Sequence, residues 1–93
     1  VDAVAMTRGH IADPHIVAKL RAGRAEDIRP CVGANYCVDF GGPAGLCLHN
    51  PATGREAVQP HVLPRAPRRR RIVIAGGGPA GLEAARTALE RGH

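Results

Sequence analysis

Aromatic residues are almost absent: the 93 residues of this chain include one Tyr, one Phe and no Trp. Proteins that bind single-stranded nucleic acid stack bases on aromatic side chains, so this composition argues against such a surface. The apolar content comes instead from Ala, Val, Ile and Leu. These residues suit the elements of an α/β protein better than a small self-contained domain, and we expect the chain to be part of a larger protein.

Four further features are missing. No apolar run approaches the roughly 20 residues that span a bilayer, and no signal-peptide pattern leads the chain. The cysteines number three, and an odd count argues against a secreted disulfide framework. No Ser–His–Asp or paired-carboxylate arrangement supports nucleophilic or glycosidic catalysis. We therefore predict a cytoplasmic protein with no membrane partner.

Basic charge is present, with a formal net charge of +5. Four arginines stand together, Arg68 to Arg71, and without them the chain is close to neutral. A basic run can bind nucleic acid, but without aromatic residues beside it a flexible linker leading into a strand is the favoured interpretation. We predict no nucleic-acid partner.

Residues 1–30 have the pattern of one βα unit. The apolar run DAVAM predicts a buried strand, and TRGHIADP predicts a loop. Asp13-Pro14 is typical of a helix start, and the helical stripe that follows ends at Gly23. A second short helix is predicted near residues 26–27. The stripe consists of Ile16, Val17 and Leu20.

A cation directly after the strand, Arg8, is the first candidate site residue. Barrel and doubly wound folds bind phosphate at the carboxyl ends of their strands, which is where this arginine would lie. A surface arginine without a ligand is the alternative interpretation.

Residues 31–66 are irregular, with turn signals GG, GP, NP and TG and little periodicity. All three cysteines lie here, at Cys31, Cys37 and Cys47. Thiolates bind soft metals and iron–sulfur clusters, but the spacing does not match a zinc knuckle. Metal ligation and three ordinary thiols are equally compatible with this pattern. His49 could complete a zinc site, although a solvated loop histidine is favoured.

Residues 67–93 contain the strongest motif. The apolar segment 72–75 predicts a strand buried on both faces of a parallel sheet. A glycine turn follows, and then a helix with Leu82, Ala85 and Leu89 on one face. The turn consists of Gly76, Gly77, Gly78, Pro79, Ala80 and Gly81.

Gly76, Gly78 and Gly81 satisfy G-x-G-x-x-G between a predicted strand and a predicted helix. The first glycine permits the tight turn, the second lets the backbone approach a pyrophosphate, and the third lets the helix pack on the strand. The helix N-terminus then offers free N–H groups to the phosphates. Dinucleotide binding is favoured over a merely structural turn. The acidic residue expected roughly 20 residues further on would lie past His93.

Taken in order, four stretches resemble one family: DAVAMTRGHIADP, KLRAGRAEDIRPCVGANYC, GLCLHNPATGRE and IVIAGGGPAGLEAAR. It is the family of NADH:flavin oxidoreductases related to trimethylamine dehydrogenase and 2,4-dienoyl-CoA reductase. The resemblance implies an α/β fold in three parts. Residues 1–30 would end an FMN-binding (β/α)8 barrel, 31–66 would form an iron–sulfur-type segment and linker, and 67–93 would begin a Rossmann-like FAD/NAD(P)-binding domain.

The same resemblance implies the cofactors and their ligands. Thr7 and Arg8 match the turn that holds the FMN phosphate. The glycine turn, from Gly76 through Gly77, Gly78, Pro79 and Ala80 to Gly81, matches the segment that holds the ADP part of FAD or a related nucleotide. The three cysteines match the first, third and fourth ligands of a 4Fe–4S cluster. The full-length enzyme would act on a small-molecule substrate and could form a homo-oligomer.

Two departures bear on the cluster. Ala34 stands where the family has its second cluster cysteine, and the interval from Cys37 to Cys47 is short for the family. A cluster with a non-cysteine fourth ligand, a three-iron cluster and no cluster all remain open. The form CVGANYC resembles a branch that demethylates N-methylated amines such as N-methylproline, and a branch that reduces enoyl C=C bonds is the alternative.

We expect the 93 residues alone to be inactive and marginally stable, because both predicted strands lack sheet partners. A small basic zinc- or nucleic-acid-binding module is the alternative from another class of protein.

Overall fold

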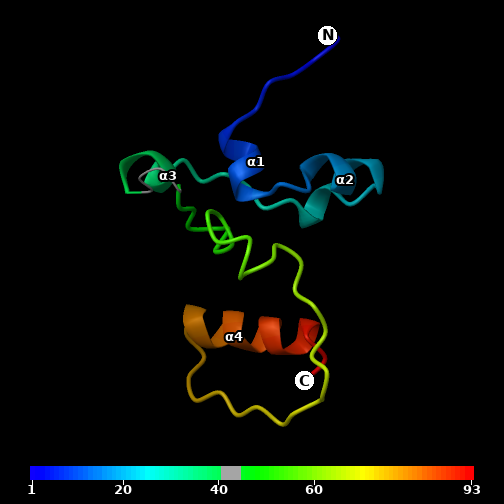
Figure 1. Ribbon diagram of the computed structural model, residues 1–93, viewed down its shortest axis with the longest axis vertical. Helices are drawn as coiled ribbons and strands as arrows, with labels where there is room; N and C mark the ends of the chain where they lie inside the picture. The colour runs from blue at the N-terminus through cyan, green and yellow to red at the C-terminus, as the bar shows by residue number, and fades with distance from the viewer. Residues whose placement is uncertain (41–44) are drawn as a thin grey trace. The chain divides into compact units, whose positions relative to one another are not determined.

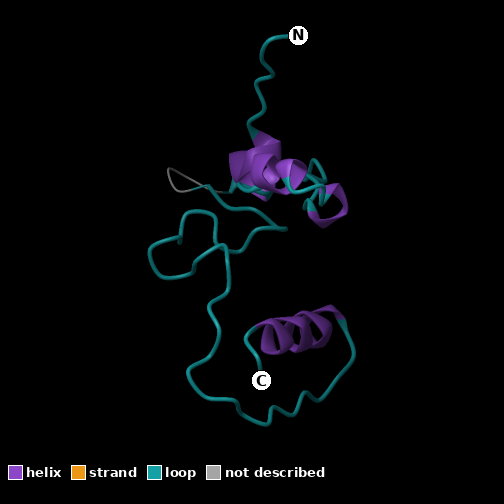
Figure 2. Ribbon diagram, turned by 90° about the vertical axis from the view of Figure 1, so that its right-hand side faces the viewer, coloured by secondary structure: helices purple, strands orange, loops and turns teal. Residues whose placement is uncertain are grey.

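The computed structural model describes residues 1–40 and 45–93, and these divide into two compact units. Unit 1 spans Val1–His61 and unit 2 spans Val62–His93. The regular elements in the described residues are helices, and no strand is assigned there (Figures 1 and 2). The predicted GG and GP turns lie outside the described residues. Among the described helices, none is long and apolar enough to cross a membrane.

The described residues of unit 1 contain four short helical elements: α1 (Arg8–Ala12), α2 (Ile16–Arg21), a 3-10 helix (Ala25–Asp27) and α3 (Tyr36–Asp39). The predicted loop TRGHIADP is wrong in part, because α1 occupies most of it. The predicted helix is confirmed as α2, although only Ile16 of its apolar stripe is buried. The second short helix, predicted to start near residues 26–27 and to stop at Pro30, occurs as the 3-10 helix and ends earlier, at Asp27.

The start of α2 differs from the prediction in a way that reveals what Asp13 does. The N-cap of α2 is His15, and Asp13 is the C-cap of α1. The carboxylate of Asp13 accepts hydrogen bonds from the backbone N–H of His15 (3.0 Å), the backbone N–H of Arg29 (3.0 Å) and the Lys19 ammonium (2.5 Å). The same Lys19 donates to the carbonyl of Asp27. One buried carboxylate therefore joins α1, α2 and the segment after the 3-10 helix, and we name these four residues the Asp13 cluster: Asp13, His15, Lys19 and Arg29.

The electrostatics of the Asp13 cluster favour the ionised carboxylate. Burial by itself raises the pKa of Asp13, but the hydrogen bonds from Lys19, Arg29 and His15 outweigh it and lower the pKa to about 2. A buried charge costs free energy unless it is paired and hydrogen-bonded, and here it is both.

A second buried polar residue, Asn50, ties the later part of unit 1 to α1. Its side-chain amide donates to the carbonyl of Ile11 (2.8 Å), and its side-chain oxygen accepts from the backbone N–H of Ala52 (3.2 Å). The hydroxyl of Thr53 donates to the same Ile11 carbonyl (3.3 Å). The carbonyls in the last turn of a helix lack partners within the helix. The Asn50 and Thr53 side chains together therefore satisfy an acceptor that α1 itself leaves unpaired.

The apolar core of unit 1 is very small. The buried hydrophobic side chains in the described residues are Ala12, Ile16 and Ala52. Large apolar residues such as Val4 and Phe40 are 80% and 70% exposed. This burial agrees with the marginal stability that we expect for the chain by itself.

Unit 2 consists of an extended segment and one helix, α4 (Pro79–Glu90). The predicted helix is confirmed: Gly78 is its N-cap, Pro79 is its first residue, and the chain turns away at Gly92 with φ +84°. The backbone N–H of Ala66 donates to the carbonyl of Arg91 (2.9 Å) and so joins the extended segment to the end of α4.

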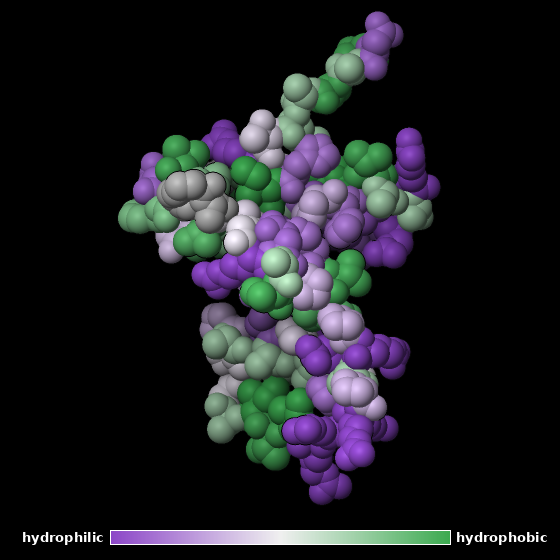
Figure 3. All heavy atoms as spheres, viewed as in Figure 1, coloured by the Kyte–Doolittle hydropathy of each residue, from purple (hydrophilic) through white to green (hydrophobic). Residues whose placement is uncertain are grey.

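The two predicted strands, DAVAM and residues 72–75, have no strand assignment. Both are exposed; in the second, Ile72, Val73 and Ile74 are 47%, 87% and 36% exposed. Figure 3 shows hydrophobic side chains gathered on one side of this part of the chain. A strand is defined by pairing with a neighbour, and neither segment has one here. The α/β fold therefore stays a prediction.

Candidate functional site

The glycine turn before α4 has the geometry that its sequence predicts. Gly76 has φ +117°, a backbone conformation that residues other than glycine rarely adopt. A Cβ on Gly81 would lie 2.1 Å from the carbonyl oxygen of Gly76 and 3.4 Å from the Ile74 side chain. The first glycine is thus required by backbone conformation, and the third is required by close approach of α4 to the segment before it.

The other side of the turn is open. A Cβ on Gly77 or on Gly78 would meet nothing within 4 Å. Gly78 lies directly before α4, where the first backbone N–H groups of a 12-residue helix have no side-chain cap. An open glycine backbone next to free helix N–H groups fits the pyrophosphate of a dinucleotide. Pro79 and Ala80 are exposed in the first turn of α4, as the motif expects.

The Thr7-Arg8 turn borders a cavity of about 520 Å³ in unit 1. Arg29, Cys31 and Gly33 also line this cavity. Thr7 is the N-cap of α1. Its carbonyl accepts a hydrogen bond from the backbone N–H of Ile11, and its hydroxyl does not cap the helix. Two arginines and a threonine line this one cavity, and residues of these types can bind a phosphate, because arginine binds phosphate oxygens through paired N–H groups.

Arg8 makes one side-chain hydrogen bond in the described residues. Its guanidinium donates to the side-chain oxygen of Asn35 at 2.7 Å, across 27 residues of chain. Sequence reasoning missed this contact, because nothing in the spacing of the two residues indicates it.

The three cysteines line one small cavity of about 30 Å³, together with Ala34 and His49. Cys31 is exposed, Cys37 and Cys47 are half-buried, and all three are free thiols. A cavity of this volume holds roughly two water molecules. Among the described residues, no group of three or more His, Cys, Asp or Glu side chains is placed to hold a metal ion.

The donor set does not fit a four-iron cluster as it stands. Such a cluster takes four thiolate ligands, and Ala34 supplies none. The side chain of His49 is exposed, and its carbonyl accepts a long hydrogen bond from Arg29 (3.4 Å). The assignment of the cysteines as ligands therefore stays a prediction from sequence.

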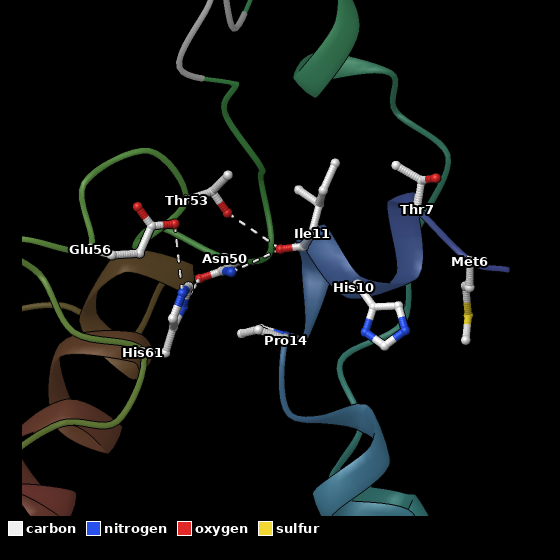
Figure 4. A pocket seen from close by; sticks show the side chains of 9 residues that line it. All are labelled: Met6, Thr7, His10, Ile11, Pro14, Asn50, Thr53, Glu56 and His61. Atoms are coloured by element: carbon white, nitrogen blue, oxygen red, sulfur yellow. Dashed lines mark hydrogen bonds and ion pairs between the residues drawn. The ribbon is translucent and has the colours of Figure 1, made fainter.

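A third cavity of unit 1, of about 450 Å³, is lined by His61, which pairs with a carboxylate and which sequence reasoning did not select (Figure 4). His61 lies 3.6 Å from the Glu56 carboxylate, and its other ring nitrogen lies 3.2 Å from the Asn50 side-chain oxygen. Hydrogen bonds from the backbone N–H groups of Glu56 itself and Gly54 lower the pKa of the Glu56 carboxyl. His10 lines the same cavity. Scattered histidines carry no sequence signal for such a pairing.

The arginine run lies in unit 2 and is exposed throughout. The backbone N–H of Arg70 donates to the ring of His93 (3.2 Å). No ion pair of Arg68, Arg69, Arg70 or Arg71 occurs in the described parts of the chain.

Comparison with known proteins places these features in context. A probable N-methylproline demethylase of Rhizobium meliloti is 61% identical over 95 aligned residues, which cover 100% of this chain and 14% of that protein. A multifunctional alkene reductase/demethylase OYE of Caballeronia cordobensis is 50% identical, with 100% and 13% covered. An N,N-dimethylglycine/sarcosine dehydrogenase of Chromohalobacter salexigens is 53% identical, with 100% and 14% covered.

The chain spans about one seventh of the length of these relatives. No family model matches it, and no solved structure does. The match nevertheless runs through all four stretches that carry the resemblance, since it covers the whole chain. In sequence, the chain is therefore similar over its whole length to one segment of enzymes of the NADH:flavin oxidoreductase family.

Proposed function

We propose that this chain is a segment of an FMN-dependent oxidoreductase that oxidises N-methylated amines. The observation that carries the proposal is the match of the whole chain, at 50–61% identity, to relatives whose names describe demethylation or amine dehydrogenation. Electrons would pass between the amine, FMN and a second nucleotide cofactor, FAD or NAD(P). The three-part α/β organisation expected from the sequence belongs to the same proposal.

The chain contributes binding groups rather than catalytic residues. Thr7, Arg8 and Arg29 would hold the FMN phosphate in the 520 Å³ cavity. The turn from Gly76 to Gly81 would hold the pyrophosphate of the second nucleotide against the N-terminus of α4. When bound, the flavin supplies the redox chemistry by accepting a hydride equivalent from a C–H bond of the substrate.

The guanidinium groups do two things for such a ligand. Their fixed positive charge compensates the phosphate, and their paired N–H groups orient it. The glycine turn works differently, because it presents backbone N–H groups and no side chain that could obstruct the nucleotide. Neither group moves a proton, so the residues that handle the substrate lie outside this chain in the proposal.

The ene-reductase alternative has one specific support, the alkene reductase/demethylase name of the Caballeronia relative. A zinc-binding module has less support, because the described residues contain no group of three or more His, Cys, Asp or Glu side chains placed to hold a metal ion. A nucleic-acid-binding module has only the exposed arginine run. A cytoplasmic location and a homo-oligomer of the full-length protein complete the proposal.

The test is the cofactor content of the full-length protein that carries this segment. We expect the purified protein to be yellow and to release FMN and a second nucleotide on denaturation, in equal amounts, as measured by absorption spectroscopy and chromatography. A colourless protein that releases no FMN would overturn the proposal.

The substrate class is tested by anaerobic bleaching of the flavin absorbance. N-Methylproline is expected to bleach the flavin and to yield formaldehyde, with water supplying the oxygen atom. Oxidation of NAD(P)H by an activated enoate, without bleaching by N-methylproline, would replace the demethylase with the ene-reductase.

A further inference from the structure

Asn35 has an unusual backbone conformation. It is the one residue other than glycine with positive φ in the described chain, at φ +55° and ψ +10°. A Cβ makes this left-handed region unfavourable, although asparagine tolerates it better than most residues. Such a conformation persists where its surroundings fix it, and it indicates that the position has a task.

The contacts of Asn35 reach in two directions. Its carbonyl accepts from the backbone N–H groups of Val38 (2.8 Å) and Asp39 (3.0 Å), and so begins α3, the helix that carries Cys37. Its side-chain oxygen accepts from the guanidinium of Arg8 at 2.7 Å. One residue therefore both starts the helix of the cysteine segment and holds an arginine from the turn before α1.

The hydrogen bond lies where two cavities adjoin. Arg8 lines the 520 Å³ cavity, whereas Asn35 lines the cavity of the cysteines. Pro30, Cys31 and Gly33 line both. The Arg8–Asn35 bond thus spans the chain segment that separates the two cavities.

The hydrogen bond restricts the Arg8 side chain but leaves most of its N–H donors unused by Asn35. A guanidinium has five N–H donors, and Asn35 accepts from one nitrogen. The remaining donors stay available for an anion. A long side chain that is already held in one rotamer loses less conformational entropy when a ligand binds.

We propose that Asn35 is a positioning residue for the anion site at Thr7-Arg8, and that it acts on a bound phosphate only through Arg8. This inference rests on the proposed function, since the anion is taken to be the FMN phosphate. The amide oxygen of Asn35 repels a phosphate oxygen and has no direct role in holding it.

The test is a double-mutant cycle on the full-length protein that carries this segment. Arg8→Gln, Asn35→Gly and the double variant are prepared as apoproteins, and the Kd for FMN is measured by quenching of flavin fluorescence on titration. Glycine at position 35 keeps the left-handed backbone and removes only the side chain. Val38→Ala, in the same short helix and exposed, is the matched control.

Arg8→Gln is expected to raise the Kd by more than about tenfold, because a charge-assisted contact to phosphate is lost. Asn35→Gly is expected to raise the Kd roughly three- to tenfold, since the net contribution of an exposed hydrogen bond is about that much. In the Arg8→Gln background, Asn35→Gly should have no further effect, and Val38→Ala should leave the Kd unchanged.

Three other results separate the ways of failing. A wild-type protein that binds no FMN contradicts the proposed function itself. Unchanged affinity in Arg8→Gln removes the anion site from this turn. If Arg8→Gln weakens FMN binding and Asn35→Gly leaves it unchanged, the positioning role alone is overturned. The same holds if the effects of the two substitutions simply add.

Discussion

Unit 1 and unit 2 differ in what holds them together. All buried residues among those the structure describes lie in unit 1, namely Ala12, Asp13, Ile16, Asn50 and Ala52. Unit 2 buries none and consists of one helix beside an exposed apolar segment. Unit 1 is therefore ordered by long-range hydrogen bonds to two polar side chains, whereas unit 2 is ordered by local helix formation and by a tight glycine turn.

This difference explains how each unit presents its candidate site. In unit 1 the phosphate-binding candidates come from segments far apart in sequence, and the Asp13 cluster fixes where Arg29 lies relative to α2. In unit 2 the site is six consecutive residues and needs no distant partner. Substitutions in the glycine turn of unit 2 should consequently affect ligand binding through local geometry, whereas substitutions in the Asp13 cluster of unit 1 should act through stability.

The largest effect is expected from Gly81→Ala in unit 2. Its Cβ would lie 2.1 Å from the Gly76 carbonyl oxygen, so the turn or α4 must shift. Overpacking of this kind costs about 1–3 kcal/mol, which corresponds to a loss of roughly five- to 150-fold in affinity for the second nucleotide. Equilibrium dialysis of the full-length protein with FAD and with NAD(P)H measures it. Ala84→Ser is the matched control, because Ala84 is exposed in α4 and lies outside the glycine turn, and equal losses in both variants would contradict the close-approach explanation.

The next effect concerns the Asp13 cluster of unit 1 and its dependence on pH. The folded pKa of Asp13 is about 2 and lies below its ordinary value of 3.8. A lowered carboxyl pKa stabilises the fold above the ordinary pKa, and this contribution of about 2 kcal/mol is lost as the pH falls from about 4 towards 2. Amide hydrogen exchange at His15 and Arg29 in the full-length protein measures it.

Asp13→Asn should remove this acid dependence and lower protection at neutral pH by a similar amount. Asp27→Asn is the control, because Asp27 is half exposed and pairs only locally with Arg24. Acid-independent protection in the wild-type protein would show that Asp13 does not organise unit 1.

The smallest effect is expected from Arg86→Ala on the exposed face of α4. The guanidinium donates to Glu83 and to Glu90, and the hydrogen bonds that Glu83 accepts are the main reason that the pKa of Arg86 is raised. Exposed ion pairs at these spacings contribute about 0.5 kcal/mol and are screened by salt. The helical signal of unit 2 in far-UV circular dichroism should fall slightly, and less at high salt. Arg69→Ala should leave it unchanged, and a loss that does not depend on salt would contradict the ionic origin, because alanine by itself favours the helix.

The sequence by itself determined the local features of the protein. The glycine turn, the Gly78-Pro79 start of α4 and the apolar stripe of α2 depend on residues within a few positions of each other, and these helices are confirmed. The resemblance to the NADH:flavin oxidoreductases followed from the order of four motif stretches, and the similarity of the whole chain to a segment of such enzymes confirms that resemblance. The predicted strands could not be tested in this way, because a strand exists only with the neighbour it pairs with.

Only the tertiary structure decided which distant residues meet. Asn50 on the Ile11 carbonyl, the Arg29 backbone on Asp13 and the Arg8 side chain on Asn35 join positions 39, 16 and 27 residues apart. No spacing rule predicts such pairs, because a hydrogen bond between two distant residues depends on the path of the chain between them. The α1 helix in place of a predicted loop is held in part by such contacts, since the Asn50 amide and the Thr53 hydroxyl both donate to the Ile11 carbonyl in its last turn.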